Sequence, residues 1–229
     1  MLQEREVSYS PPREDGGAAR KEPIMLFRAN VQRLPLPHNS VDLIFTDPPY
    51  LRQYLECYHW PAQEAKRVLK PRGFVLALCG GLYLNRIFRY FDEAGLTFYW
   101  KYEMYMASEQ TSRVRPQGNP DISIRVNSKP ILAYSKGVAL PPLSTLNMIR
   151  SGERDKRYHQ WGQDVATARY FVAHFSRPGD MVLDPFIGGG TTAVACQQAG
   201  RRWIGGDLDG HALTTTQDRL NQSPAPMRR

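Results

Sequence analysis

Residues 181–209, MVLDPFIGGGTTAVACQQAGRRWIGGDLD, decide the fold. The run at 181–183 is short and apolar, as a buried strand should be, and a glycine-rich turn leads from it into a helix expected over 191–199. A second strand is expected over 202–205, and it ends in Gly206-Asp207-Leu208-Asp209. A strand, a turn, a helix and a further strand of these lengths form one βαβ unit, in which the two strands lie parallel.

The same alternation continues toward the N-terminus. Short apolar runs predict strands, and apolar residues at helical spacing predict helices. The expected strands are 23–29, 41–46, 74–79, 97–106 and 131–135, and the expected helices are 54–69, 82–94, 165–175 and 211–220. This order predicts an α/β fold with a mostly parallel sheet and helices on both faces. Such sheets bind their ligands outside the carboxyl ends of the strands.

The composition agrees with one packed domain. The chain has 229 residues, of which 41% are hydrophobic, which excludes a wholly disordered protein and leaves too little chain for two large domains. The three cysteines lie far apart without metal-ligand spacing, so neither a disulfide framework nor a zinc site is expected. No apolar run approaches the roughly 18 residues that span a membrane. We expect a flexible segment over 1–23, a domain over 24–222 and a tail over 223–229.

The net charge of +8 is concentrated in one segment. Residues 105–160 hold nine basic and four acidic side chains, which gives a net charge of +5. The segment is rich in Pro, Gly, Ser and Asn, so it is expected to form loops around one strand, and loops on a rigid scaffold often bind ligands. On charge alone, a surface for a polyanion and a merely solvated loop fit equally well.

The glycine-rich turn at 184–192 is the first candidate site. Glycines let a backbone turn tightly and approach a ligand, and the following helix start offers free N–H groups. Asp207 ends the next strand, where a carboxylate can bind the ribose hydroxyls of a nucleoside cofactor, while Asp209 is expected to cap the final helix. The chain has no GxxxxGK[ST] pattern, which disfavours a nucleoside triphosphate. Ala193 replaces the third glycine of the dinucleotide pattern, which disfavours NAD without excluding it.

The second candidate site is Asp47-Pro48-Pro49-Tyr50, directly after the expected strand 41–46. A residue that precedes proline is pushed out of the helical region, so this tetrapeptide is extended and stiff. The Asp47 carboxylate and the Pro48 carbonyl make a pair of acceptors suited to an NH₂ group, with the Tyr50 ring beside them for stacking. The alternative is a proline-stiffened turn with a buried tyrosine, and the position at a strand end favours the functional interpretation.

In this order the two motifs resemble the DNA amino-methyltransferases that use S-adenosylmethionine. DPPY at 47–50 looks like the family's catalytic motif, and DPFIGGGTT at 184–192 resembles its FxGxG cofactor loop. Catalytic motif first and cofactor loop last is the circularly permuted order of the family's beta class. The resemblance covers about 24–222 and implies a Rossmann-like methyltransferase sheet with a small, loop-rich target-recognition insertion at about 105–160.

The resemblance also implies roles for single residues. Asp47 and the Pro48 carbonyl would hold the target amine, Pro49 completes the catalytic motif, and Tyr50 would stack on an extruded base. The residues expected to bind the cofactor are Asn30, His159, Gln163, Asp184, Phe186, Gly188, Gly190, Thr191 and Asp207. Those expected to bind DNA are Arg113, Arg115, Arg125, Lys129, Arg150, Arg154, Lys156 and Arg157.

The implied reaction is methyl transfer to the exocyclic N6 of adenine in DNA, since position 47 holds Asp rather than Ser. Cytosine N4 methylation is the first alternative, and a catalytically inactive DNA-binding subunit is the second. The target atom is unreachable inside a duplex, so the base must flip out. DNA is the expected partner, with no membrane and no metal, and the short recognition segment leaves room for a homodimer. The implied setting is the cytoplasm of a bacterial cell, with a bacterial, plasmid or phage origin.

Overall fold

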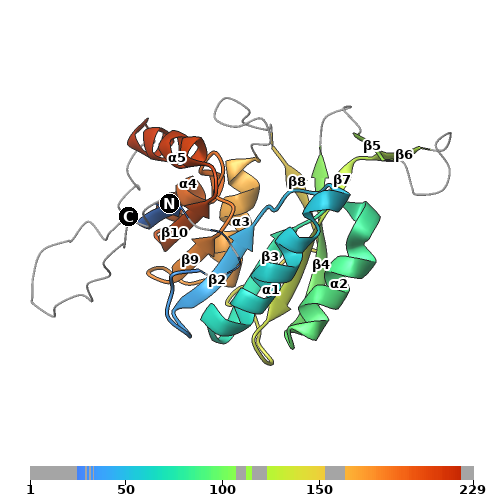
Figure 1. Ribbon diagram of the computed structural model, residues 1–229, viewed down its shortest axis with the longest axis horizontal. Helices are drawn as coiled ribbons and strands as arrows, with labels where there is room; N and C mark the ends of the chain where they lie inside the picture. The colour runs from blue at the N-terminus through green and yellow to red at the C-terminus, as the bar shows by residue number, and fades with distance from the viewer. Residues whose placement is uncertain are drawn as a thin grey trace, which may run out of the picture.

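The computed structural model describes residues 25–28, 30, 32, 34–106, 112–114, 123–152 and 163–222. Its centre is an eight-stranded sheet with the strand order β1-β10-β9-β2-β3-β7-β4-β8 (Figure 1). These strands are β1 Met25–Arg28, β2 Val41–Thr46, β3 Leu69–Leu78, β4 Thr97–Met106, β7 Ser128–Ser135, β8 Met148–Ser151, β9 Met181–Asp184 and β10 Arg202–Asp207. Only β7 is antiparallel to its neighbours in this sheet, so the predicted mostly parallel sheet is confirmed.

Helices cover both faces of the sheet, as expected. The helices are α1 Glu56–Val68, α2 Leu84–Glu93, α3 Val165–Phe175, α4 Thr191–Gln198 and α5 Gly210–Gln222, and two short 3-10 helices are η1 Arg52–Tyr54 and η2 Gly81–Tyr83. Successive side chains of β2 alternate between the two layers, because strand residues point to opposite faces. Ile44 packs with buried residues of α1 and α2, whereas Leu43 and Phe45 pack with those of α3, α4 and α5.

The connection from α1 to β3 differs from the expectation. Lys70-Pro71-Arg72-Gly73 was expected to end the helix and precede a strand at 74, but β3 begins at Leu69, directly after α1. The four residues form an irregularity within the strand, since Val41 lies opposite Leu69 and Leu43 opposite Phe74. Arg72 takes a positive φ of 68° there. A segment with Pro and Gly therefore marks a bulge here rather than a loop.

The segment 105–160 holds more strands than the single one expected. Besides β7 it contains β8 and a separate pair, β5 Ser112–Val114 with β6 Ile124–Val126. β8 lies parallel to β4 at the edge of the large sheet. The expectation of loops around one strand was therefore wrong. Each of these additional strands has only three or four residues, too few for a clear alternation of apolar and polar side chains.

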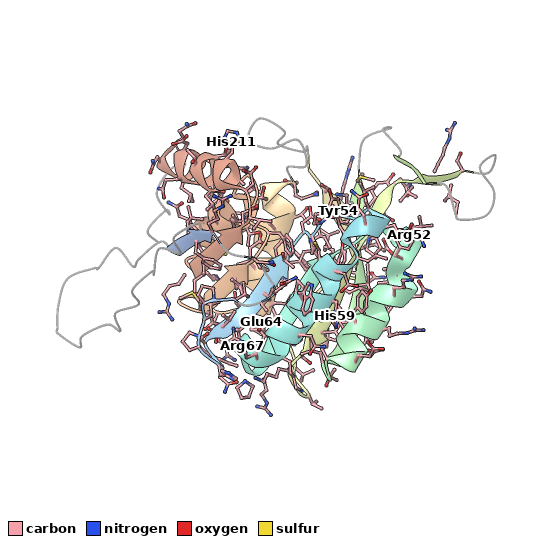
Figure 2. All side chains as sticks on the ribbon, in the orientation of Figure 1. Arg52, Tyr54, His59, Glu64, Arg67 and His211 are labelled. Atoms are coloured by element: carbon pink, nitrogen blue, oxygen red, sulfur yellow. The ribbon has the colours of Figure 1, made fainter. Side chains whose placement is uncertain are left out.

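A partly buried ion pair on α1 holds the segment before β2 in place. Glu64 and Arg67 pair at 2.6 Å, Glu64 Oε2 accepts from the Leu34 N–H at 2.8 Å, and Arg67 donates to the carbonyls of Leu34 and Leu36. Figure 2 shows both side chains at the end of α1 that lies away from Arg52 and Tyr54. This contact fixes the amino-terminal edge of the sheet, opposite the candidate site.

The strand order creates a topological switch point between β9 and β2. β9 and β2 are neighbours, but the chain leaves β9 toward β10 on one side and leaves β2 toward β3 on the other. Parallel sheets bind ligands at such a switch point, outside the carboxyl ends of the two strands. Both candidate motifs follow these two strands. Within the described ranges, no helix is long and apolar enough to cross a membrane.

Candidate active site

Asp184 joins the two motifs at the switch point. Its Oδ1 accepts from Thr46 Oγ1 at 2.9 Å and from the Phe186 N–H at 3.1 Å, and its Oδ2 accepts from Thr192 Oγ1 at 2.5 Å. The carboxyl group is buried, and this burial raises the pKa of Asp184 to about 7, although the hydrogen bonds from Thr192 and Thr46 oppose the rise. Asp184 therefore ties the end of β2 to the loop after β9 and to the start of α4.

Asp47 lies next to this junction with both carboxylate oxygens engaged. The hydroxyl of Tyr50 donates to Oδ1. The side-chain amide of Gln163 donates to Oδ2 at 2.5 Å. Gln163 was expected at the cofactor, and in the structure its amide holds the carboxylate of the DPPY motif. Its Oε1 atom is buried and has no hydrogen-bond partner among the described residues.

Tyr50 is fixed by three groups. Its Cβ lies 3.3 Å from the place of a Cβ at Gly80, so a larger residue at position 80 would press on it. Lys129 Nζ donates to the Tyr50 hydroxyl at 3.1 Å and sits 4.7 Å from the ring centroid, within the range of a cation–π contact. Burial and the nearby Asp47 raise the pKa of Tyr50 well above its usual value, so the hydroxyl stays protonated and donates. Lys129 was expected at a phosphate and instead contacts the catalytic motif.

Tyr58 supports the motif from below and was not foreseen from the sequence. Its hydroxyl lies within hydrogen-bonding distance of two carbonyl oxygens, 3.3 Å from that of Pro48 and 3.0 Å from that of Leu78. A buried tyrosine needs a hydrogen-bond partner for its hydroxyl. The position of Tyr58 on the apolar face of α1 could therefore have indicated a polar contact with a neighbouring element. Pro48 is buried and Pro49 is exposed.

Asp207 organises the glycine loop through its carboxylate. Oδ2 accepts from the Gly188 N–H at 3.0 Å, and Oδ1 accepts from the Asp209 N–H at 2.9 Å. Each oxygen retains a second lone pair, so the group can still accept from a ribose hydroxyl. Asp209 Oδ1 accepts from the His211 N–H at 2.9 Å, which confirms Asp209 as the cap of α5.

α5 holds the glycine loop from behind. Thr216 Oγ1 donates to the Gly188 carbonyl at 2.8 Å, and the buried Arg219 donates to the Gly189 carbonyl at 2.7 Å. Gly190 has a φ of 77°, and a Cβ there would lie 2.9 Å from Thr216 Cγ2. Thr216 and Arg219 were also missed, although a basic residue among the buried positions of a helix signals a specific polar partner.

The remaining candidates are spread around the same edge of the sheet. Asn30 is exposed, and its Oδ1 accepts from the Gln32 N–H at 3.1 Å. Arg125 lies opposite Arg113 in the β5–β6 pair, and Arg150 lies opposite Tyr105 near the carboxyl end of β4. These strands stand at the upper edge in Figure 1. Arg115, Arg154, Lys156, Arg157 and His159 lie outside the described residues.

The sequence is similar to methylases and methyltransferases. The N6/N4 family described as "DNA methylase" matches residues 142–218. The putative methylase YubD of Escherichia coli (strain K12) is 30% identical over 185 residues, which cover 75% of this chain and 78% of that protein. The type II methyltransferase M.HpaI of Haemophilus parainfluenzae is 25% identical over 221 residues, which cover 81% of this chain and 70% of that protein.

Solved structures share the fold at lower identity. The complex of M1.HpyAVI with SAM has a TM-score of 0.70 at 21% identity, covering 86% of this chain and 99% of that one. PvuII DNA methyltransferase, described as cytosine-N4-specific, has a TM-score of 0.74 at 18% identity, covering 85% of each chain. The chain belongs to the N6-adenine/N4-cytosine family of DNA amino-methyltransferases. It is a DNA methyltransferase, and its methyl donor is S-adenosylmethionine.

The residues at the switch point fit this cofactor. The glycine loop follows β9 at this switch point, and glycines carry no side chain that would keep a ligand from the backbone. Gln163 Oε1, which has no hydrogen-bond partner among the described residues, offers an acceptor for an ammonium or amino group. The Asp207 carboxylate offers further acceptors for hydroxyls. Among the described residues, no cluster of His, Cys, Asp or Glu could hold a metal ion.

Proposed function

We propose that the protein methylates the exocyclic N6 of adenine in DNA, acting on a base that has left the duplex. The observation that carries this proposal is the Asp47 carboxylate beside the supported Pro48 carbonyl, at the switch point of the sheet. Two fixed acceptors at this place suit the two hydrogens of an amino group. Asp rather than Ser at position 47 favours adenine by resemblance.

The chemical task is to activate a weak nucleophile. The lone pair of an exocyclic amine is delocalised into the ring, so the amine attacks only as its nitrogen becomes tetrahedral. Asp47 and the Pro48 carbonyl would accept hydrogen bonds from its N–H groups and stabilise the positive charge that develops on nitrogen. The bound cofactor supplies the methyl group as an electrophile and leaves as a neutral thioether, and the methylated nitrogen loses one proton to water. No covalent intermediate with the enzyme is required, and the buried Cys79 and Cys196 take no part.

Tyr50 would exchange its present contact during this cycle. Its hydroxyl occupies Asp47 Oδ1, one of the acceptors that the target amine needs. When the base enters, the amine would replace the hydroxyl, and the ring would stack on the base to offset part of the stacking lost from the duplex. Lys129, 3.1 Å from the hydroxyl, would continue to hold the tyrosine.

The cofactor roles form part of the same proposal. Phe186, Gly188, Gly190 and Thr191 would line the methionine side, Asp207 would bind the ribose, and Asp184 would support the pocket from below through Thr46 and Thr192. Asn30 would lie toward the adenine of the cofactor, in the place of an Asp in the family. Gln163 would contact the cofactor through Oε1, which has no partner in the described part of the chain, because its amide NH₂ group holds Asp47.

Two other functions are separable from this one. Cytosine N4 methylation uses the same amine chemistry, and the fold shared with the cytosine-N4-specific PvuII enzyme supports it. An inactive DNA-binding subunit would retain the fold without the chemistry, and the network around Asp47 speaks against it. DNA binding by residues 105–160, and a homodimer that shares recognition, stay predictions.

One experiment separates these functions. Purified protein is incubated with labelled S-adenosylmethionine and unmethylated DNA, the DNA is digested to nucleosides, and the product is identified by mass. We expect N6-methyladenine, and we expect it to vanish with Asp47→Ala while cofactor binding, measured by calorimetry, persists. N4-methylcytosine would establish the first alternative instead. Cofactor binding without any methylated base would favour the inactive subunit.

A further inference from the structure

The turn that follows Tyr50 presents an apolar side chain to solvent beside the site. Leu51 is 62% exposed, although leucine is usually buried. Its backbone is extended, with φ −74° and ψ 151°, and its carbonyl accepts from the Tyr54 N–H at 2.8 Å. The exposed leucine therefore stands at the start of a closed turn that is only one residue from the catalytic motif.

The turn is anchored on both sides. Tyr50 points inward, where it packs beside Gly80 and donates to Asp47. Leu55 is buried at the other end, and its carbonyl accepts from the Tyr58 N–H at 2.9 Å at the start of α1. Because neighbouring residues of an extended backbone point in opposite directions, the inward Tyr50 directs Leu51 outward. The position of Leu51 is thus set by the catalytic motif itself.

The surroundings of Leu51 suit a nucleic acid. The exposed Arg52 and Tyr54 follow it, and residues 51–55 contain no acidic side chain. The next residue, Glu56, lies in the first turn of α1, with Oε2 3.4 Å from His59 Nδ1. Figure 2 shows Arg52 and Tyr54 together at the N-terminal end of α1, at the carboxyl edge of the sheet. Basic side chains bind phosphates, and apolar side chains enter base steps that have been opened. The turn therefore combines the positive charge of Arg52, the aromatic ring of Tyr54 and the apolar side chain of Leu51.

We propose that Leu51 enters the space that the target base vacates in the duplex, while Arg52 binds a flanking phosphate. The proposal rests on the proposed function, since a vacated space exists only when a base has been extruded onto Tyr50. Extrusion costs stacking and pairing energy, and an inserted side chain offsets part of that cost. Leu51 thereby acts as a positioning residue for the base and makes no contact with the reacting atoms.

The test compares exposed leucines at opposite edges of the sheet. Leu51→Ala is the test variant, Leu51→Met restores an apolar side chain, and Leu140→Ala is the matched control. Leu140 falls within 105–160, but none of the described basic residues expected to bind DNA is at its end of the sheet. It is 84% exposed and lines a hollow with Asp42, Lys70 and Asp180, at the amino-terminal edge away from the site. The position methylated by the wild-type enzyme is first mapped by sequencing. Two synthetic duplexes are then used, one with the target base paired and one with a mismatch opposite it.

A wedge matters most when the base is firmly stacked and paired, because a mismatch lowers the cost of extrusion. We expect Leu51→Ala to lower kcat/KM on the paired duplex by about tenfold and on the mismatched duplex by less than about threefold. Leu51→Met and Leu140→Ala should stay within about twofold of the wild type on both, and the KM for the cofactor should not change. Equal losses on both duplexes, or no loss on either, would overturn the role of Leu51. A wild-type protein that methylates no DNA would instead overturn the proposed function.

Discussion

Gln163 donates from Nε2 to Asp47 Oδ2 across 2.5 Å, and its backbone oxygen lies 3.5 Å from Thr191 Oγ1. One residue from the segment before α3 thus reaches both the catalytic motif and the first residue of the cofactor-side helix α4. Its Oε1 atom is buried without a hydrogen-bond partner in the part of the chain that the structure describes. Gln163 couples the two motifs that the permuted sequence separates by more than a hundred residues.

This contact predicts an order among substitutions at position 163. Gln163→Ala removes a donor to Asp47 and should lower kcat by about tenfold, since a hydrogen bond to a charged group contributes about 1.5–3 kcal/mol. Gln163→Glu should be worse near neutral pH, because two carboxylates would face each other. The Glu variant should recover part of its rate at lower pH, where the introduced carboxyl group is protonated and can donate. A Glu variant as active as the Ala variant across the pH range would contradict the contact.

The main strands and helices could be predicted because their signals are local. The elements at 41–46, 97–106 and 165–175 have the predicted bounds, since each is a run of clear period between polar or proline-containing segments. β8 was missed because four residues with an exposed Met148 at a sheet edge show no period. The antiparallel direction of β7 depends on tertiary pairing with β3 and β4, which no local pattern encodes.

The site residues likewise fall into those that contiguous motifs predicted and those that only the tertiary structure revealed. Asp47, Tyr50 and the glycine loop stood out because they are contiguous motifs at strand ends. Tyr58 was missed because it lies among the apolar positions of α1. Arg219 was missed because its carbonyl partner, Gly189, lies 30 residues away along the chain. Lys129 was expected to bind DNA because it is a basic residue of the segment that resembles a target-recognition region. Only the pairing of β7 with β3 brings it to Tyr50.

Substitutions at Tyr50 should separate its ring from its hydroxyl. Tyr50→Ala should lose most activity, whereas Tyr50→Phe and Tyr50→Trp should keep part of it, because stacking needs a ring. Tyr50→Phe also frees Asp47 Oδ1 before the base arrives, so its KM for DNA should not rise. Single-turnover rates and KM for a DNA substrate would measure both effects. Equal losses in all three variants would speak against a stacking role.

Asp184 should make the stability of the protein depend on pH in a defined direction. Its pKa is about 7 in the folded protein because of burial, and about 3.9 in an unfolded chain. Between these values the folded state holds the proton more tightly, so the stability that Asp184 contributes is complete at low pH and is lost as pH rises through about 7.

The comparison of wild type with Asp184→Asn isolates this group. The free energy of unfolding of the wild type, relative to that of the Asn variant, should fall by about 2–3 kcal/mol between about pH 5 and about pH 8. Urea denaturation at several pH values gives the two curves. Parallel curves would mean that the Asp184 carboxyl ionises in the folded protein as it does in the unfolded chain.

Gly190 and Gly200 allow the strain of a positive φ to be separated from a steric clash. Their φ angles are 77° and 69°, so alanine is strained at both. A Cβ at Gly190 would lie 2.9 Å from Thr216 Cγ2 and 3.2 Å from Thr216 Cα, whereas a Cβ at Gly200 meets nothing within 4 Å. Gly200→Ala should therefore cost only about 1–2 kcal/mol of stability.

Gly190→Ala should cost more, about 3 kcal/mol or above, because strain and overpacking add. It should also weaken the binding of S-adenosylmethionine, since relief of the clash with Thr216 requires the glycine loop to move from Asp207 and Arg219. Thermal unfolding and calorimetric titration with the cofactor measure the two effects. If Gly200→Ala weakened cofactor binding as much as Gly190→Ala does, backbone strain alone would explain the loss. In that case the packing of α5 against the glycine loop would not contribute to cofactor binding.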